Sequence, residues 1–134
     1  MSFVLDASVT AAWCFADGRY PVADAAFERL AHERAVVPAL WWVEIRNVLI
    51  MGERRRRIDA AATAQFLSDL ERMPIEAQGG PASEIVLALA RRHKLTAYDA
   101  IYLELAGRLC VPLATLDARL AGAAEADDIP LVRA

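Results

Sequence analysis

Four acidic residues stand at positions from which they could hold a metal ion together. Asp6 follows a short apolar run at the start of the chain, and Asp117 follows another near its end. Asp99 lies near the start of a helical segment, and Glu44 lies in an otherwise apolar stretch. Carboxylates that share one site repel one another, and a divalent cation removes that repulsion. An all-oxygen set without His or Cys favours Mg²⁺ or Mn²⁺, which can activate water for attack on a phosphate.

Each of these acids also has a purely structural explanation. Asp6 and Asp117 can cap the helices that follow them. Asp99 stands three residues after Thr96, the spacing of a capping box with Asp in place of Glu. Glu44 is harder to explain in this way, because a carboxylate among apolar residues is costly unless it is paired or bound to a metal. An arginine from another element is the alternative partner for it.

Three polar residues near the acids fit a supporting role. Ser8 stands two residues after the first acid, and Thr115 stands two residues before the last one. Their hydroxyls can hold a carboxylate or a bound water, although local turn and cap bonding is an equal alternative. Asn47 stands three residues after Glu44 and therefore shares its helix face.

The elements that must position these residues alternate between short apolar strands and helices. We expect strands over 2–5, 35–37, 75–77, 111–115 and 129–132, and helices over 7–16, 22–33, 39–53, 59–72, 81–93, 97–109 and 117–124. Such alternation predicts an α/β fold with a parallel sheet covered on both faces. The active crevice of such a sheet lies outside the carboxyl ends of its strands. If the first and fourth strands are neighbours, Asp6, Asp99 and Asp117 converge there, with Glu44 reaching in from its helix.

Length and composition set the class of protein. The chain has 134 residues, which fits a single domain over 1–134, and its 57% apolar and 25% charged residues exclude a disordered chain. No apolar run is long enough to span a membrane and no secretory signal is present, so we expect a cytoplasmic protein. The net charge of −3 argues against nucleic-acid binding driven by overall charge, but not against an enzyme with a local basic strip. Cys14 and Cys110 lack zinc-site spacing and are interpreted as small apolar side chains on helices.

Four segments, in order along the chain, resemble the four acidic motifs of PIN domains. They are Val4-Leu5-Asp6-Ala7-Ser8, Pro38-Ala39-Leu40-Trp41-Trp42-Val43-Glu44, Tyr98-Asp99-Ala100-Ile101-Tyr102-Leu103 and Thr115-Leu116-Asp117-Ala118-Arg119-Leu120. One such motif alone is weak, but the ordered set at family spacing is specific. The match covers nearly the whole chain and is most similar to the VapC ribonuclease toxins of bacterial toxin–antitoxin pairs.

The resemblance implies a fold, an activity and partners. The fold would be a PIN-like α/β/α sandwich with a central parallel sheet of about four or five strands. The activity would be Mg²⁺- or Mn²⁺-dependent endoribonuclease cleavage, in which metal-activated water hydrolyses RNA phosphodiester bonds. Asp6, Asp99 and Asp117 would hold the metal, with Glu44 binding directly or through water, and Asn47 would match a polar position of the toxins. The partners would be the RNA substrate, a VapB-like antitoxin and a second copy in a homodimer.

Three other functions compete with this one. A PIN-like module could bind RNA or protein without cleaving, although no acid of the four motifs is lost. A haloacid-dehalogenase-type phosphatase also places an Asp after its first strand, but it needs a second acid at the position of Ser8 and a suitable lysine. A signalling receiver needs a lysine after its last strand, whereas Lys94 precedes that strand.

Basic and aromatic residues bear on the substrate and the partners. Arg54, Arg55, Arg56 and Arg57 follow a long helix, where they can simply stabilise its C-terminus or contact RNA. The other arginines are scattered, so phosphate contacts should be few and the salt dependence modest. Trp41 and Trp42 point to different sides of a helix, so one should pack on the sheet and the other suits a dimer or antitoxin interface. Tyr98 and Tyr102 share a helix face and are predicted to lie in the core.

Overall fold

A parallel four-stranded sheet forms the centre of the molecule. The computed structural model describes residues 1–15, 18–80 and 83–134. The sheet has the order β3-β2-β1-β4, and every neighbouring pair is parallel. The strands are β1 (Ser2–Leu5), β2 (Arg34–Pro38), β3 (Ile75–Gln78) and β4 (Leu113–Ala114).

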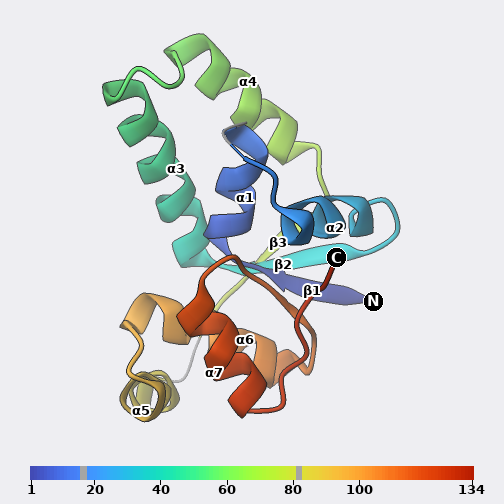
Figure 1. Ribbon diagram of the computed structural model, residues 1–134, viewed down its shortest axis with the longest axis vertical. Helices are drawn as coiled ribbons and strands as arrows, with labels where there is room; N and C mark the ends of the chain where they lie inside the picture. The colour runs from blue at the N-terminus through green and yellow to red at the C-terminus, as the bar shows by residue number, and fades with distance from the viewer. Residues whose placement is uncertain (16–17, 81–82) are drawn as a thin grey trace.

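Helices cover both faces of the sheet, as Figure 1 shows. One layer holds α1 (Ala7–Cys14), α2 (Pro21–Arg29), α3 (Ala39–Arg54) and α4 (Ala60–Glu71). The other layer holds α5 (Ser83–His93), α6 (Ala97–Leu109) and α7 (Ala118–Ala126). The predicted α/β/α sandwich is therefore confirmed. None of the helices in the described ranges is long and apolar enough to cross a bilayer.

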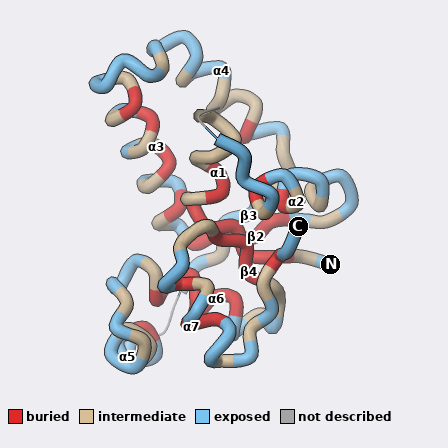
Figure 2. Tube along the Cα trace, in the orientation of Figure 1, coloured by how far each residue is buried: buried red, intermediate tan, exposed pale blue. Residues whose placement is uncertain are grey.

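The core lies between the sheet and the helices that face it. The buried segments in Figure 2 include most of β1, β2 and β4 and the inner faces of α1, α3 and α6, whereas β3 has no buried residue. Phe3, Val4 and Leu5 of β1 are fully buried, because this strand has neighbours on both edges and helices on both faces. Such a strand reads as a continuous apolar run, which is why β1 could be recognised in the sequence.

The sheet order places a topological switch point beside β1. The chain runs from β1 to β2 and β3 on one side, and then crosses over to β4 on the other side. Crevices of open parallel sheets form where this reversal occurs, outside the carboxyl ends of the two diverging strands. Asp6 directly follows β1, and Thr115 directly follows β4, so both lie at that point.

The predicted fifth strand is wrong. Residues 129–132 form a single parallel bridge, Leu113 with Leu131, and no strand. Pro130 has no N–H to donate, so this segment cannot form a regular ladder along β4. β4 is also shorter than predicted, because the Val111 N–H ends helix α6 by bonding to the Ala106 carbonyl. The remaining elements match their predicted bounds within a few residues. The predicted helix end at residue 16 and helix start at residues 81–82 lie outside the described residues.

Several described helices end on a residue with left-handed backbone that is not glycine. These residues are Arg56, Lys94, Cys110 and Asp128, with φ of 57°, 55°, 56° and 56°. Cys110 caps α6 and is exposed, so the prediction that it is an apolar filler on a helix is wrong. A side chain with a β-carbon is strained in this conformation, whereas glycine adopts it freely.

We expect Cys110→Gly to stabilise the protein. The substitution removes a left-handed backbone strain of about 1 kcal/mol, which corresponds to a rise in Tm of about 3 °C. Cys110→Ala is the matched control, since it removes the same thiol but keeps the β-carbon. Thermal unfolding measured side by side should show a higher Tm for the glycine variant alone. Equal Tm values for the two variants would contradict this account.

Candidate active site

The carboxylate of Asp6 is held by two hydroxyl groups from opposite ends of the chain. Ser8 Oγ and Thr115 Oγ1 each donate to Asp6 Oδ2, both at 2.7 Å. Asp6 is only 5% exposed, and the two donors offset part of the cost of burying its carboxylate. Asp6 occupies the N-cap position of α1 without a side-chain capping bond, so the capping explanation does not hold for it.

Backbone bonds join the two loops that carry these residues. The Asp6 N–H donates to the Ala114 carbonyl at 3.0 Å, which extends the pairing of β1 and β4. The Leu116 N–H donates to Ser8 Oγ at 3.0 Å, and the Asp117 N–H donates to Thr115 Oγ1 at 3.0 Å. Both hydroxyls thus accept a backbone bond from the loop that follows β4. Both also hold the carboxylate of Asp6, which lies in the loop that follows β1. The network holds the ends of both strands in one rigid arrangement.

Glu44 finds its partner in a tyrosine. Tyr102 Oη donates to Glu44 Oε1 at 2.6 Å across α6 and α3. Tyr102 is fully buried, and burial together with the neighbouring Glu44 charge raises the pKa of its hydroxyl, which therefore stays protonated. No arginine pairs with Glu44 among the residues that the structure describes, so the alternative of an arginine partner is not seen.

Asp99 and Asp117 combine helix capping with a place near the other acids. The Asp99 N–H donates to Thr96 Oγ1 at 3.2 Å, as the predicted cap of α6 requires. Asp117 Oδ1 accepts from the N–H groups of Arg119 and Leu120 at 2.8 and 3.1 Å, so this residue does cap α7. The capping bonds of Asp117 occupy one of its two oxygens.

The four carboxylates share one electrostatic environment. Burial raises the pKa of Asp6, and the charge of Asp117 raises it further against the opposing hydroxyl bonds. Burial also raises the pKa of Glu44, with added repulsion from Asp6 and Asp99. The pKa of Asp99 is raised by burial and then by the charges of Asp117 and Asp6. Like charges therefore accumulate at this end of the sheet, where a bound cation would relieve their repulsion.

The donor set fits a hard divalent cation. It consists of carboxylate and hydroxyl oxygens, the ligands that Mg²⁺ and Mn²⁺ prefer. Within the described part of the chain, none of the four acids forms an ion pair with Arg, Lys or His. No three Asp, Glu, His or Cys side chains of the described residues stand close enough to enclose an ion. The acids form a cluster of mutually repelling charges, and a cation would have to draw them together.

The aromatic predictions divide into correct and incorrect ones. Trp41 is buried and donates from Nε1 to Thr10 Oγ1 at 3.0 Å, while Trp42 is 56% exposed, so the two point apart as predicted. Tyr98 was predicted to lie in the core and is 60% exposed, so that prediction is wrong. It lies in the first turn of α6, beyond the elements that bury the rest of the helix.

Asn47 is exposed on α3 and lines a groove together with Ser8.

Sequence reasoning missed the role of Tyr102 beside Glu44. A signal was present, because Tyr102 stands three residues after Asp99 and therefore shares its helix face. If Asp99 faces the other acids, the hydroxyl of Tyr102 must lie near them too. An apolar stretch that contains one glutamate also requires a donor from another element.

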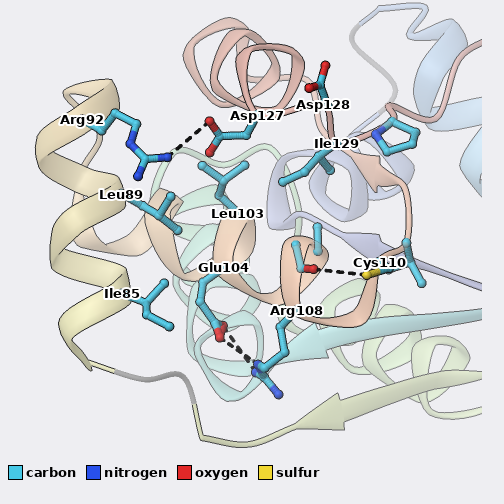
Figure 3. A pocket seen from close by; sticks show the side chains of 14 residues that line it. Ile85, Leu89, Arg92, Leu103, Glu104, Arg108, Cys110, Asp127, Asp128 and Ile129 are labelled. Carbon is cyan, nitrogen blue, oxygen red and sulfur yellow. Dashed lines mark hydrogen bonds and ion pairs between the residues drawn. The ribbon is translucent and has the colours of Figure 1, made fainter.

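Another hollow lies away from the acids, in the layer that α5, α6 and α7 form. It has a volume of about 830 Å³ and opens between α5, α6 and the segment after α7. Figure 3 shows Ile85, Leu89, Leu103 and Ile129 around it. Two ion pairs lie at its rim, Arg108 Nε with Glu104 Oε1 at 2.7 Å and Arg92 Nη1 with Asp127 Oδ1 at 3.5 Å. None of the four predicted acids lines this hollow.

Comparison with known proteins agrees with this arrangement. The family model of the PIN domain matches residues 3–126. The chain belongs to the PIN domain family. This PIN domain resembles PAE2754 from Pyrobaculum aerophilum with a TM-score of 0.73 and 24% identity, over 92% of this chain and 84% of that one. It also resembles Mycobacterium tuberculosis VapC20, a sarcin-ricin loop cleaving toxin, with a TM-score of 0.64 and 12% identity, over 98% and 99% of the two chains.

The comparison with curated proteins gives no significant match. At these identities the solved structures show a shared fold. Membership of the PIN family sets aside the haloacid-dehalogenase-type phosphatase and the signalling receiver, which have different folds. The roles of the individual acids in this PIN domain stay predictions that the following experiments test.

We expect Tyr102→Phe to weaken the metal-dependent RNA cleavage predicted for this PIN domain by about 10- to 100-fold, the usual effect of losing a group that orients a ligand. The substitution removes only the hydroxyl that fixes Glu44, and it leaves the buried ring in place. The Mn²⁺ concentration for half-maximal cleavage should rise, while the Tm changes little. Tyr98→Phe is the matched control, because it removes an exposed hydroxyl from the same helix. An unchanged Mn²⁺ requirement in Tyr102→Phe would show that Glu44 needs no such positioning.

Proposed function

We propose that this PIN domain is an endoribonuclease that requires Mg²⁺ or Mn²⁺. The observation that supports it is the cluster of four carboxylates at the switch point, each within the field of others and without a cationic partner among the described residues. A structural role would favour neutralising such charges, since their repulsion costs stability. Retaining four acids at one end of the sheet is explained by a function that needs a cation.

In this proposal Asp6, Asp99 and Asp117 hold the cation, and Glu44 binds it directly or through water. When bound, the cation activates water and stabilises the charge that develops on the scissile phosphate. Ser8 and Thr115 keep the Asp6 carboxylate in one orientation, so this one ligand would already be positioned when the cation draws the other acids toward it. Tyr102 holds the Glu44 carboxylate in the same way, and Asn47 lines the groove that Ser8 also lines.

We further propose that the protein is the toxin of a toxin–antitoxin pair in the cytoplasm. Support comes from the PIN family match, from the order of the motifs, and from the fold shared with VapC20 over nearly the full length of both chains. Its partners would be RNA, a VapB-like antitoxin and a second copy of the chain. The exposed pair Trp42 and Val43 on α3 is a candidate interface, with the Arg46 guanidinium stacked 3.6 Å from the Trp42 ring centre.

Cleavage of total cellular RNA tests this proposal. The purified protein is stripped of metal and incubated with RNA in EDTA, in Mg²⁺ and in Mn²⁺. Discrete fragments that require the metal would support a nuclease, and sequencing their ends would identify the target. Binding of both metal and RNA without cleavage under any condition would favour the alternative of a PIN-like binding module. Failure to bind metal would overturn the four-carboxylate site itself.

A further inference from the structure

A groove leads away from the acidic cluster between α1 and α3. It has a volume of about 490 Å³, and its lining reaches from Ser8 and Leu116 at the cluster to Arg55 and Arg57 beyond α3. Ser8 donates to Asp6, so one end of the groove is continuous with the proposed catalytic centre. Asn47 and Met51 of α3 line it in between. The groove thus joins a strongly acidic end to a basic end.

The structure divides the four consecutive arginines into two kinds. Arg55 and Arg57 line the groove, whereas Arg54 does not, although its Nη1 lies 3.8 Å from Sδ of the groove residue Met51. Arg56 has left-handed backbone and does not line this groove; it lines a different hollow, which Arg57 also borders. The Arg56 N–H bonds to the Glu53 carbonyl and the Arg57 N–H to the Gly52 carbonyl, which is the Schellman end of a helix. Because this turn decides which of the four arginines line the groove, the run of arginines in the sequence could not show the division.

The spacing along α3 matches an extended ligand. Asn47, Met51 and Arg55 follow one another at intervals of four residues, and therefore form one stripe on the helix. Eight residues of helix span about 12 Å. Arg55 thus lies about 12 Å along the helix from Asn47, while Arg57 is held by stacking on the Phe15 ring at 4.3 Å from its centre. A chain that enters at the acids can reach both guanidinium groups without bending around the molecule.

We propose that this groove binds the single-stranded RNA that flanks the scissile phosphate, with Arg55 and Arg57 contacting backbone phosphates. The inference rests on the proposed function, which places the scissile phosphate at the acids. Guanidinium groups are suited to phosphate oxygens, and the apolar side chains between them offer contact to bases or sugars. Two such contacts agree with a net charge of −3, which leaves little attraction for RNA elsewhere.

An acidic segment of a protein partner is the competing occupant. It would also meet Arg55 and Arg57, and the apolar lining of Phe15, Val48 and Met51 would suit its side chains. RNA is favoured because the groove is continuous with the acids. An acidic peptide that ran into this end would be repelled, whereas RNA reaches the acids through the cation that they bind.

Salt dependence of RNA binding tests the inference. The probe is a fluorescein-labelled, mixed-sequence single-stranded RNA of roughly ten nucleotides, titrated by fluorescence anisotropy in EDTA over a range of salt. Each phosphate contact to single-stranded nucleic acid contributes about −0.7 to the slope of log K against log salt. We expect a slope near −1.4 for the wild type and near −0.7 for Arg55→Ala. Arg54→Ala, its neighbour in the run, should keep the wild-type slope, and Arg55→Lys should largely restore it.

The outcomes separate this inference from the proposed function. Equal slopes for Arg55→Ala and Arg54→Ala, or no binding of the oligonucleotide by the wild type, would overturn the groove as an RNA site. If the wild type still cleaves total RNA, only the inference fails. If the predicted slopes are found but no RNA is cleaved, the groove stands and the nuclease proposal fails. Displacement of a bound acidic peptide by salt, without RNA binding, would assign the groove to a protein partner instead.

Discussion

Asp99→Asn is expected to lower RNA cleavage by about a thousandfold or more while the fold is retained. The asparagine has the same shape, and the backbone N–H of residue 99 that caps α6 on Thr96 is unaffected. The lost negative charge removes a proposed ligand of the cation, and several kcal/mol of charge stabilisation in the transition state go with it. About 4 kcal/mol corresponds to a factor of 1000 in rate. The measurement is the initial rate of RNA cleavage at saturating Mn²⁺.

Asp24→Asn is the matched control for this variant. Asp24 is likewise an acid in the first turn of a helix, α2, but it is exposed and belongs to no cluster. It should retain wild-type activity. If Asp99→Asn kept activity within about tenfold of the wild type, a direct role of Asp99 in metal binding would be untenable.

The carboxylate cluster is expected to make the metal-free protein less stable as the pH rises above about 4. The pKa values of Asp6, Glu44 and Asp99 are raised in the folded state, so the folded state binds more protons than the unfolded chain. Their favourable contribution is complete below the unfolded pKa values, near 4, and is lost as the pH rises through the folded pKa values. In EDTA the Tm should therefore be higher at pH 5 than at pH 8.

Added Mn²⁺ should reverse this trend. A ligand at a hundredfold excess over its Kd stabilises the folded state by about 2.7 kcal/mol. The gain in stability should be larger at pH 8 than at pH 5, because raised carboxyl pKa values favour protonation at the lower pH and a protonated carboxyl is a poor ligand. Asp99→Asn should show a flatter pH dependence in EDTA and little response to Mn²⁺, which separates the cluster from other titrating groups. A wild-type Tm that rises steadily with pH in EDTA would contradict the shared repulsion.

The sequence predicted those parts of the fold that depend on local pattern. The apolar run of β1 and the Asp59, Thr96 and Asp117 caps are encoded within a few residues, and the structure has each of them. The fifth strand failed because strand formation depends on a partner ladder, which Pro130 and the two-residue β4 do not offer. The prediction that Tyr98 is buried failed for a related reason, since helix periodicity does not show where the elements that cover a helix end.

In the candidate site, too, some features could be predicted from the sequence and others could not. The positions of the four acids followed from their placement after strands and within helices. The hydrogen bonds that orient them did not, because Thr115 and Ser8 are 107 residues apart and Tyr102 and Glu44 are 58 apart. Spacing alone could suggest that these hydroxyls hold a carboxylate, but not that Ser8 and Thr115 act on the same oxygen of Asp6. That detail is decided by the parallel pairing of β1 with β4.

The position of β1 inside the sheet also determines when the acidic cluster can assemble during synthesis of the chain. Asp6 and Thr115 are separated by 109 residues, yet they form one hydrogen-bonded unit. At roughly 5–20 residues per second, translation delivers Thr115 on the order of ten seconds after Asp6. Until then β1 has an open edge, and Asp6 lacks its donor Thr115 and its acidic neighbour Asp117. A nascent chain that stalls before β4 therefore lacks part of the proposed catalytic centre and exposes a strand edge that favours aggregation.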